Sequence, residues 1–241
     1  YTRQVREMNE AAARSGRVFG IMFNQRTLPL YQKIRDLVRS GELGRIHRVQ
    51  WTITNWYRTQ RYYDSGGWRA TWKGEGGGVL LNQCPHNLDL WQWMVGMPTR
   101  IRGFCKAGRF HRIEVEDEAT IVAEYPDGAT GLFVTSTGEA PGLNRLEIAG
   151  ENGLLVAQDG LKFRQNRRSS IAFSDDPKSG GFAQPECWDV TIPVPARESG
   201  HAQITRNWVN AILTGEPLLA PGEDGIRSLQ ISNAAYLSSW L

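Results

Sequence analysis

Apolar residues recur every three or four positions in five stretches of the chain, a spacing typical of amphipathic helices. The first stretch covers residues 2–15 and ends at Gly16, a residue suited to closing a helix. Pro85 suits the first position of the predicted helix over residues 85–96. The first N–H groups of a helix have no partner within it, so proline loses nothing there by lacking an N–H group. The other predicted helices cover residues 29–40, 85–96, 199–214 and 223–241.

Apolar and polar residues alternate from Thr99 to about Ile192, which predicts a succession of strands with one buried face. The stretches ATIVAEYPDGATGLFVTST and RLEIAGENGLLVAQ are predicted hairpins that turn at PDG and ENG. One more long strand is predicted over RIHRVQWTITNW, residues 45–56. Strands that follow one another through tight turns indicate an open, mainly antiparallel sheet.

The segment RVFGIMFNQR, residues 17–26, has a different pattern. Its apolar residues run on almost without interruption, as in a parallel strand that is buried on both faces. A helix, a glycine and a buried strand make half of a βαβ unit. The sequence therefore predicts an α+β fold: the end of a parallel α/β domain up to about Arg26, then an open antiparallel sheet with helices on one face.

Composition narrows the choice of partner and compartment. The 241 residues include 28 Lys and Arg against 25 Asp and Glu, a near balance that argues against nucleic acid as the main partner. No apolar run reaches the ~18 residues of a membrane span, so no membrane association is expected. The three cysteines lie far apart without a C-x-x-C pair, which indicates reduced thiols and a cytoplasmic protein.

The stretch GGGVLLNQCPHNLDL, Gly76 to Leu90, combines a glycine loop with a histidine at a helix start. Glycines let a flat ligand approach the backbone. The helix dipole would keep His86 neutral, and a neutral imidazole can accept a proton as a general base. Asn82 would hydrogen-bond the same substrate, and Asp89 at i+3 would orient the ring.

The alternative is that this stretch is only a loop followed by a helix start, with His86 as a cap or surface group. The other histidines, His47, His111 and His201, are interpreted as structural, and no pair has the i, i+4 spacing of metal ligands, so no metal site is expected. The acidic run at residues 116–118 is interpreted as solvated.

Several motifs together resemble the Gfo/Idh/MocA oxidoreductases, the family of glucose–fructose oxidoreductase and inositol dehydrogenase. GEGGGVLLNQCPHNLDLWQWMVGMP resembles the family's central motif, and SGELGRI, WYRTQRYYDSGGWRATW, EVEDEATIVAEYPDGATG and EIAGENG occur in the family's order. Full-length members have an N-terminal Rossmann domain for NAD or NADP and a C-terminal domain with the substrate site and oligomer interface. The resemblance implies that residues 1–26 end a truncated Rossmann domain and that residues 27–241 form the C-terminal substrate-binding and oligomerisation domain.

The resemblance assigns His86 as the catalytic acid/base. The family's motif has an acidic residue four positions earlier, where this chain has Asn82, so Asn82 is expected to bind substrate without joining a proton relay. The family's glycine-rich dinucleotide fingerprint and its Glu-Lys-Pro-like motif are absent from the sequence. No cofactor is therefore expected on this chain alone, which should be inactive, whereas the full-length parent would use NAD or NADP.

The implied function is the substrate-side part of an NAD(P)-dependent dehydrogenase of a sugar or polyol hydroxyl or keto carbon. A homodimer or homotetramer through the sheet is expected. A second hypothesis is a non-catalytic ligand-binding or oligomerisation domain of the same fold. The loop over residues 57–78 is long enough to suggest a function. The candidate side chains in this loop would contact substrate or, alternatively, pack between subunits. They are Arg58, Arg61, Trp68, Arg69 and Trp72.

Overall fold

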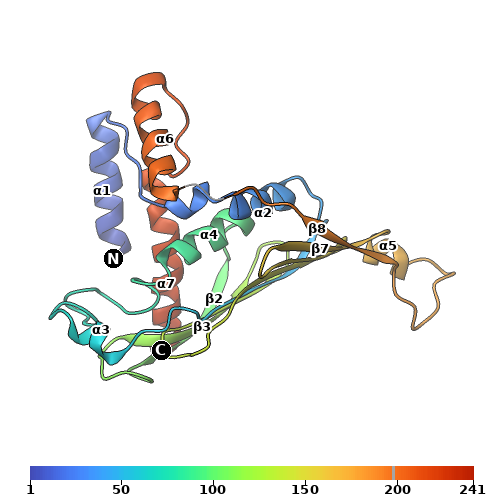
Figure 1. Ribbon diagram of the computed structural model, residues 1–241, viewed down its shortest axis with the longest axis horizontal. Helices are drawn as coiled ribbons and strands as arrows, with labels where there is room; N and C mark the ends of the chain where they lie inside the picture. The colour runs from blue at the N-terminus through green and yellow to red at the C-terminus, as the bar shows by residue number, and fades with distance from the viewer. Residues whose placement is uncertain (197–198) are drawn as a thin grey trace.

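The computed structural model describes residues 1–196 and 199–241, which form one open β-sheet with helices on one of its faces (Figure 1). The sheet has eight strands in the order β2-β3-β4-β1-β5-β6-β7-β8. All neighbouring strands are antiparallel except β1 and β4, which run parallel. The predicted α+β architecture with a mainly antiparallel open sheet is confirmed.

The predicted hairpins correspond to β3–β4 and β5–β6, each joined by a tight turn. The first strand does not lie beside the second; it enters the middle of the sheet, between β4 and β5. The strands are β1 (Ile46–Ile53), β2 (Arg100–Ala107), β3 (Glu116–Glu124), β4 (Thr130–Ser136), β5 (Asn144–Gly150), β6 (Gly153–Ala157), β7 (Leu161–Asn166) and β8 (Cys187–Ile192).

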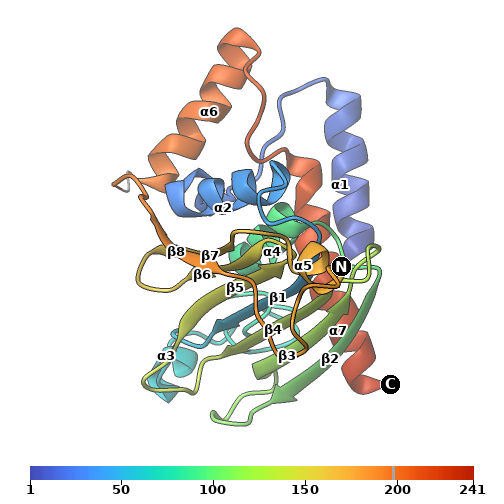
Figure 2. The same cartoon turned by 90° about the vertical axis from the view of Figure 1, so that its right-hand side faces the viewer.

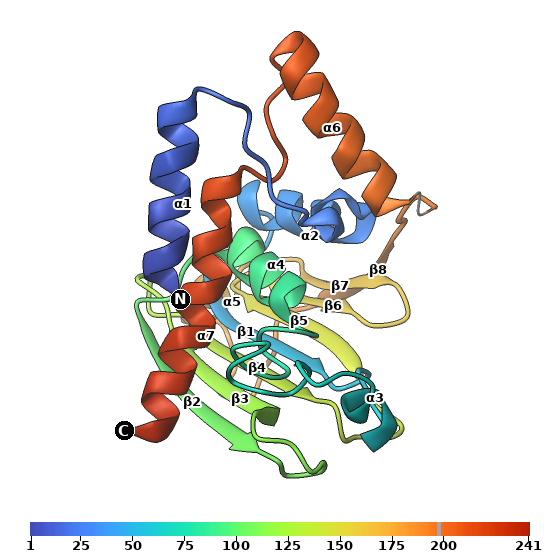
Figure 3. The same ribbon diagram turned by 90° about the vertical axis from the view of Figure 1, so that its left-hand side faces the viewer.

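Five of the helices correspond to those predicted from periodicity. Of the two short ones, α3 lies in the predicted loop over residues 57–78, and α5 interrupts the stretch predicted as a succession of strands. Helices α4 and α7 lie over the sheet, whereas α1 and α6 project away from it (Figures 2 and 3). The elements are α1 (Thr2–Ser15), η1 (Asn24–Thr27), α2 (Pro29–Arg39), α3 (Gln60–Asp64), α4 (Pro85–Val95), α5 (Ser170–Ser174), α6 (Gly200–Thr214), η2 (Gly222–Asp224) and α7 (Gly225–Trp240), where η marks a 3-10 helix.

The core lies between the sheet and the helices. On β1 every second residue, Val49, Trp51 and Ile53, is buried, and Trp51 meets Phe133 of β4 edge to face with ring centroids 6.0 Å apart. Burying side chains of this size stabilises the fold by roughly 1.5–3 kcal/mol each. Helix α4 is buried from Asn87 to Met94, as expected for a helix with apolar residues on most of its surface.

The opposite face of the sheet is bare of helices (Figure 1). It carries exposed apolar side chains, among them Phe104 at 49% and Val122 at 41% exposure. In the middle of this face Glu147 accepts hydrogen bonds from Arg48 (2.9 Å) and Arg145 (2.7 Å). The alternation that buries one face therefore leaves a mixed apolar and charged surface on the other.

The predicted strand over residues 17–26 is wrong. Gly20 forms one antiparallel bridge with Pro221, and the segment then turns into η1. Val18 and Met22 are 37% and 51% exposed. The apolar run resembles a buried strand, but among the described residues its strand pairing is limited to the single bridge with Pro221.

No helix among the described residues is both long enough and apolar enough to cross a membrane. The three cysteines are free thiols: Cys84 and Cys105 are buried, and Cys187 is exposed.

Candidate functional site

The glycine loop ahead of α4 is held by a buried carboxylate, Glu116 of β3. This carboxylate accepts hydrogen bonds from the backbone N–H groups of Gly78 (2.8 Å) and Leu80 (2.9 Å) and from the Tyr236 hydroxyl (2.7 Å). Burial raises the pKa of Glu116, and these donors counteract that shift. The interpretation of residues 116–118 as solvated is thus wrong for Glu116 and Asp117, because buried loop N–H groups require them as acceptors.

Two of the three loop glycines are explained by packing against this anchor. A Cβ at Gly78 would overlap the backbone of Glu116, and a Cβ at Gly77 would overlap the Tyr236 hydroxyl. Gly76 has open space around it but a φ of +80°, a conformation that favours glycine. The glycines therefore serve the local fold, which places the start of α4 firmly against β3.

Asp89 of α4 faces a buried arginine. Its two oxygens accept hydrogen bonds from Arg26, Nε to Oδ2 at 2.8 Å and Nη2 to Oδ1 at 2.6 Å, and Gln92 donates a third (2.9 Å). The Arg26 and Asp89 side chains are each 1% exposed. Within residues 1–196 and 199–241 no hydrogen bond joins Asp89 to His86, so Asp89 ties α4 to η1.

His86 is the second residue of α4 and is half-buried. Its ring meets Phe23 edge to face, with centroids 5.9 Å apart. Its Nδ1 is buried without a hydrogen-bond partner in the described part of the chain. Burial lowers the pKa of His86, and the nearby His201 lowers it further, whereas Asp89 opposes the shift. The ring is therefore favoured in its neutral form, as predicted, but burial is the principal cause.

His201, in the first turn of α6, lies near His86. The Asn24 amide nitrogen lies 3.2 Å from His201 Nδ1, and Asn24 directly follows Phe23, which packs on His86. Sequence analysis interpreted His201 as structural and did not place it near His86. No local pattern connects them, because only tertiary packing brings α6 beside η1.

Asn82 lies in a polar cluster that joins the loop to the start of α4. Its amide nitrogen donates to Glu75 Oε1, and its oxygen accepts from Gln83 (2.9 Å) and from the Tyr62 hydroxyl (3.3 Å). The Glu75 side chain is 8% exposed and also accepts from the backbone N–H of Ala70 (2.7 Å). Sequence analysis missed Tyr62 and Glu75, although an acidic residue inside a glycine-rich loop was a usable signal.

Arg69 extends this cluster toward solvent. It donates to the Tyr62 hydroxyl (2.9 Å) and lies 3.9 Å from Glu75. Its guanidinium stacks on the rings of Tyr62 and Trp68, at 4.6 and 4.5 Å from their centroids. Trp68 is 51% exposed, so one aromatic ring and one cation are presented together at the edge of the loop.

The remaining loop candidates lie in different surroundings. Arg58 donates to the carbonyl of Tyr57 (2.9 Å) and lies over the Tyr62 ring at 5.1 Å. Arg61 is exposed on α3. Trp72 packs edge-on against Trp240 of α7 with centroids 5.1 Å apart, a contact within one chain, whereas the two expectations were substrate contact and packing between subunits.

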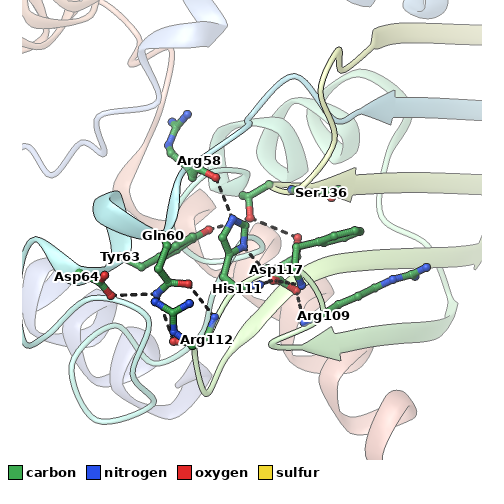
Figure 4. Close-up of polar contacts among 12 residues, drawn as sticks. Arg58, Gln60, Tyr63, Asp64, Arg109, His111, Arg112, Asp117 and Ser136 are labelled. Atoms are coloured by element: carbon green, nitrogen blue, oxygen red, sulfur yellow. Dashed lines mark hydrogen bonds and ion pairs between the residues drawn. The ribbon is translucent and has the colours of Figure 1, made fainter.

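A second buried carboxylate, Asp117, anchors the connection between β2 and β3, which lies beside the loop (Figure 4). It accepts hydrogen bonds from the backbone N–H groups of Arg109, Phe110 and His111. His111 Nδ1 lies 3.0 Å from Asp117, and its Nε2 lies 2.8 Å from the Arg58 carbonyl oxygen. His111 thus fixes the backbone of the loop beside Arg58.

The structure brings Asn82, Arg69 and Arg58 together around Tyr62, and His86 follows Asn82 by one turn at the same loop–helix junction. It does not bring Asp89 or Arg61 into this cluster. Among the described residues no group of three His, Cys, Asp or Glu side chains is placed to hold a metal ion. The arrangement offers one neutral imidazole beside several hydrogen-bonding groups.

Comparison with known proteins places this site within a family. The family described as GFO/IDH/MocA C-terminal domain matches residues 31–156, which include β1, the loop, α4 and most of the sheet. The trans-1,2-dihydrobenzene-1,2-diol dehydrogenase of Bos taurus is 27% identical over 162 residues, 65% of this chain and 44% of that protein. The chain thus spans less than half of this relative's length.

Solved structures share the whole fold. The WlbA dehydrogenase of Chromobacterium violaceum, in complex with NADH and UDP-GlcNAcA, is 25% identical with a TM-score of 0.79, covering 100% of this chain and 66% of that one. A levoglucosan dehydrogenase in complex with NADH and levoglucosan has a TM-score of 0.76 at 18% identity, covering 99% of this chain and 68% of its own. At that identity the second similarity shows the fold alone.

Proposed function

This chain belongs to the GFO/IDH/MocA family, and from that membership we propose that it is the substrate-side part of an NAD(P)-dependent dehydrogenase. The proposed substrate is a sugar or polyol, and the proposed reaction interconverts its hydroxyl and keto carbon. The family match includes His86, Asn82 and the whole loop over residues 57–78. A structural neighbour at 25% identity holds NADH with UDP-GlcNAcA, which supports this choice of cofactor and substrate class.

One observation carries the proposal: the buried Nδ1 of His86 has no hydrogen-bond partner among the described residues, at a helix start where Gln83 Oε1 and Asn87 Oδ1 are unpartnered as well. A buried polar atom without a partner costs roughly 1–3 kcal/mol, so such an atom requires an explanation. With the ring's own proton on the buried Nδ1, Nε2 is left to meet a substrate hydroxyl. A neutral imidazole can take the hydroxyl proton as the O–H bond breaks. The nicotinamide, when bound, supplies the hydride chemistry.

We assign substrate binding to the cluster around Asn82. Asn82, Tyr62 and Arg69 present an amide, a phenol and a guanidinium, groups that hydrogen-bond sugar hydroxyls. Glu75 is hydrogen-bonded to Asn82. It would supply, from the loop, the negative charge that the family motif has at the Asn82 position.

The boundary at residue 26 remains a proposal, supported by exposed apolar surface. Ile212 and Leu213 of α6 are 50% and 74% exposed, and a cavity of about 310 Å³ separates α6 from residues 20–22. Apolar patches of this kind mark interaction surfaces. We assign this surface to contact with the dinucleotide-binding domain, since the chain has no glycine-rich turn of its own to hold a pyrophosphate.

The bare face of the sheet is the surface proposed for a homodimer or homotetramer. Phe104 and Val122 supply apolar area on it, and the Arg48–Glu147–Arg145 group supplies polar contacts. Mixed surfaces of this type are common at subunit interfaces.

The three free thiols support the proposal of a cytoplasmic location.

The proposal is tested by His86→Ala in the enzyme that joins this chain to its dinucleotide-binding domain. Turnover is expected to fall by ~10²–10⁴-fold, because positioned acid–base groups contribute about that much. The KM should change less, since the ring is not the main substrate contact. The measurement is NAD(P)H absorbance with a panel of sugars and polyols that includes levoglucosan and UDP-GlcNAcA.

Asn82→Ala is the matched comparison, because it removes a hydrogen bond but no proton acceptor. Its turnover should fall by no more than about tenfold, and its pH profile should keep the wild-type shape. Near-normal turnover and an unchanged pH profile in His86→Ala would contradict the assignment of His86. Sugar binding without any NAD(P)-dependent turnover in the wild type would instead support the non-catalytic alternative.

A further inference from the structure

A cavity of about 510 Å³ lies near the far end of α4 from His86, between α4, α2 and the segment that contains η2. Trp93 lines it, and this residue is about 10 Å along the helix from His86, at a rise of ~1.5 Å per residue. The charged residues in its wall are four arginines and one acid: Arg26, Arg35, Arg39, Arg227 and Asp224.

The acid is already engaged by two of the arginines. Arg26 donates to Asp224 Oδ2 (2.8 Å) and to the Leu219 carbonyl (3.0 Å), and its other bonds go to Asp89. Asp224 Oδ1 faces Arg227 at 3.5 Å. Arg26 is therefore saturated as a structural residue, and among the described residues Asp224 forms no hydrogen bond or ion pair with Arg35 or Arg39.

Arg35 is held in place through its Nε, and within residues 1–196 and 199–241 its outer nitrogens have no hydrogen-bond partner. Its guanidinium stacks on the Trp93 ring at 4.0 Å, and its Nε donates to the Trp93 carbonyl (3.2 Å). Burial lowers the pKa of Arg35 to about 10, and the nearby cations of Arg39 and Arg26 add to that effect. The carboxylates of Asp36 and Asp224 oppose this shift but do not cancel it. A bound anion would therefore stabilise these cations further, and a fixed guanidinium loses little entropy when it binds one.

We propose that this cavity binds a small organic phosphate, held by Arg35, Arg39 and Arg227. Guanidinium groups pair with phosphate oxygens through two parallel hydrogen bonds, which suits Arg better than any other side chain. Met94, Met97 and Leu218 give the wall an apolar part that fits the carbon part of the ligand. The volume lies within the roughly 300–1,000 Å³ of small-molecule sites.

The site requires neither His86 nor a nicotinamide cofactor, so it stands apart from the proposed dehydrogenase activity. It can be tested on the 241-residue chain itself by isothermal titration calorimetry at low ionic strength. The probes are phenyl phosphate, inorganic phosphate and phenol, none of which is a sugar. Phenyl phosphate should bind in the submillimolar range, inorganic phosphate more weakly, and phenol not measurably.

Arg39→Gln and Arg35→Gln should each weaken phenyl phosphate binding about tenfold, the usual effect of losing one charged hydrogen bond. Arg102→Gln is the matched control, since it removes one exposed positive charge from β2, outside this cavity. Arg39 is exposed, so its variant keeps the test valid even if Arg35→Gln lowers the melting temperature.

Three outcomes would overturn the proposal. The first is no saturable binding of phenyl phosphate at millimolar concentrations. The second is equal weakening by Arg102→Gln, which would show attraction by the overall charge of the surface. The third is binding of a glutamate-rich peptide that Arg39→Gln abolishes, without phenyl phosphate binding, which would identify an acidic protein partner instead.

Discussion

His86 and Asp89 lie one turn apart on α4, yet they differ in their hydrogen-bond partners. Both oxygens of Asp89 are occupied by Arg26 and Gln92. The buried Nδ1 of His86 has no partner in the described part of the chain, and the Phe23 ring packs edge-on against the imidazole. Asp89 therefore holds the fold together through its hydrogen bonds, whereas His86 and its neighbour Asn87 keep hydrogen-bonding atoms that the described residues do not use.

The largest effect that tests this contrast is expected from Asp89→Ala. The change leaves Arg26 buried with half of its acceptors gone, and breaking a buried ion pair from one side costs about 3–5 kcal/mol. The free energy of unfolding should fall by that amount in urea denaturation followed by circular dichroism.

Glu124→Ala is the control for this variant. It breaks the exposed pair of Arg100 and Glu124, whose side chains are 77% and 56% exposed, and should cost no more than about 1 kcal/mol. Equal losses in the two variants would mean that the Arg26–Asp89 pair does not anchor α4.

A smaller effect is expected from Glu116→Gln. The amide has nearly the same shape, but its NH₂ group would point at a backbone N–H or at the Tyr236 hydroxyl, which now donate to the carboxylate. Leaving such a buried donor unpaired costs about 1–3 kcal/mol, read as a loss of unfolding free energy. Glu118→Gln, at the solvent edge of the same strand, should change stability by less than about 1 kcal/mol.

The smallest effect concerns the pH dependence of stability due to His86. Its pKa is lowered in the folded chain, so below about pH 6.5 the unfolded chain takes up a proton that the folded chain resists. The unfolded state then binds more protons, and the free energy of unfolding must fall as the pH decreases.

His86→Gln removes this contribution, so its stability should fall less steeply than that of the wild type between pH 7.5 and pH 5.5. The difference should not exceed about 1.4 kcal/mol for each unit by which the pKa is lowered. Parallel stability curves for the two proteins would show that the fold does not disfavour the charged ring.

Sequence periodicity predicted the helices and hairpins well, because each has one apolar face or one tight turn that a local pattern records. The limits of α1 and the proline at the start of α4 are as predicted. Residues 17–26 were wrongly predicted as a buried strand, because an apolar run does not show how many strands will pair with it in the folded chain.

The site was predictable only in part. Asn82 and His86 stand in one motif, but their surroundings come from elsewhere in the chain. Glu116 and Asp117 resemble a solvated acidic run until the fold brings loop N–H groups to them. His201 contacts Asn24, which lies next to the residues that pack on His86. Tertiary packing makes this contact, so no local spacing in the sequence predicts it.

The place of β1 in the sheet also sets the order in which the protein can assemble. Ile46–Ile53 is made early during synthesis, but its two neighbours are Thr130–Ser136 and Asn144–Gly150. Until residue 136 has left the ribosome this strand has two open edges, and until residue 150 has left it one edge stays open. Closing such long loops is slow, so the nascent chain is expected to depend on chaperones and to aggregate when translation stops before β5.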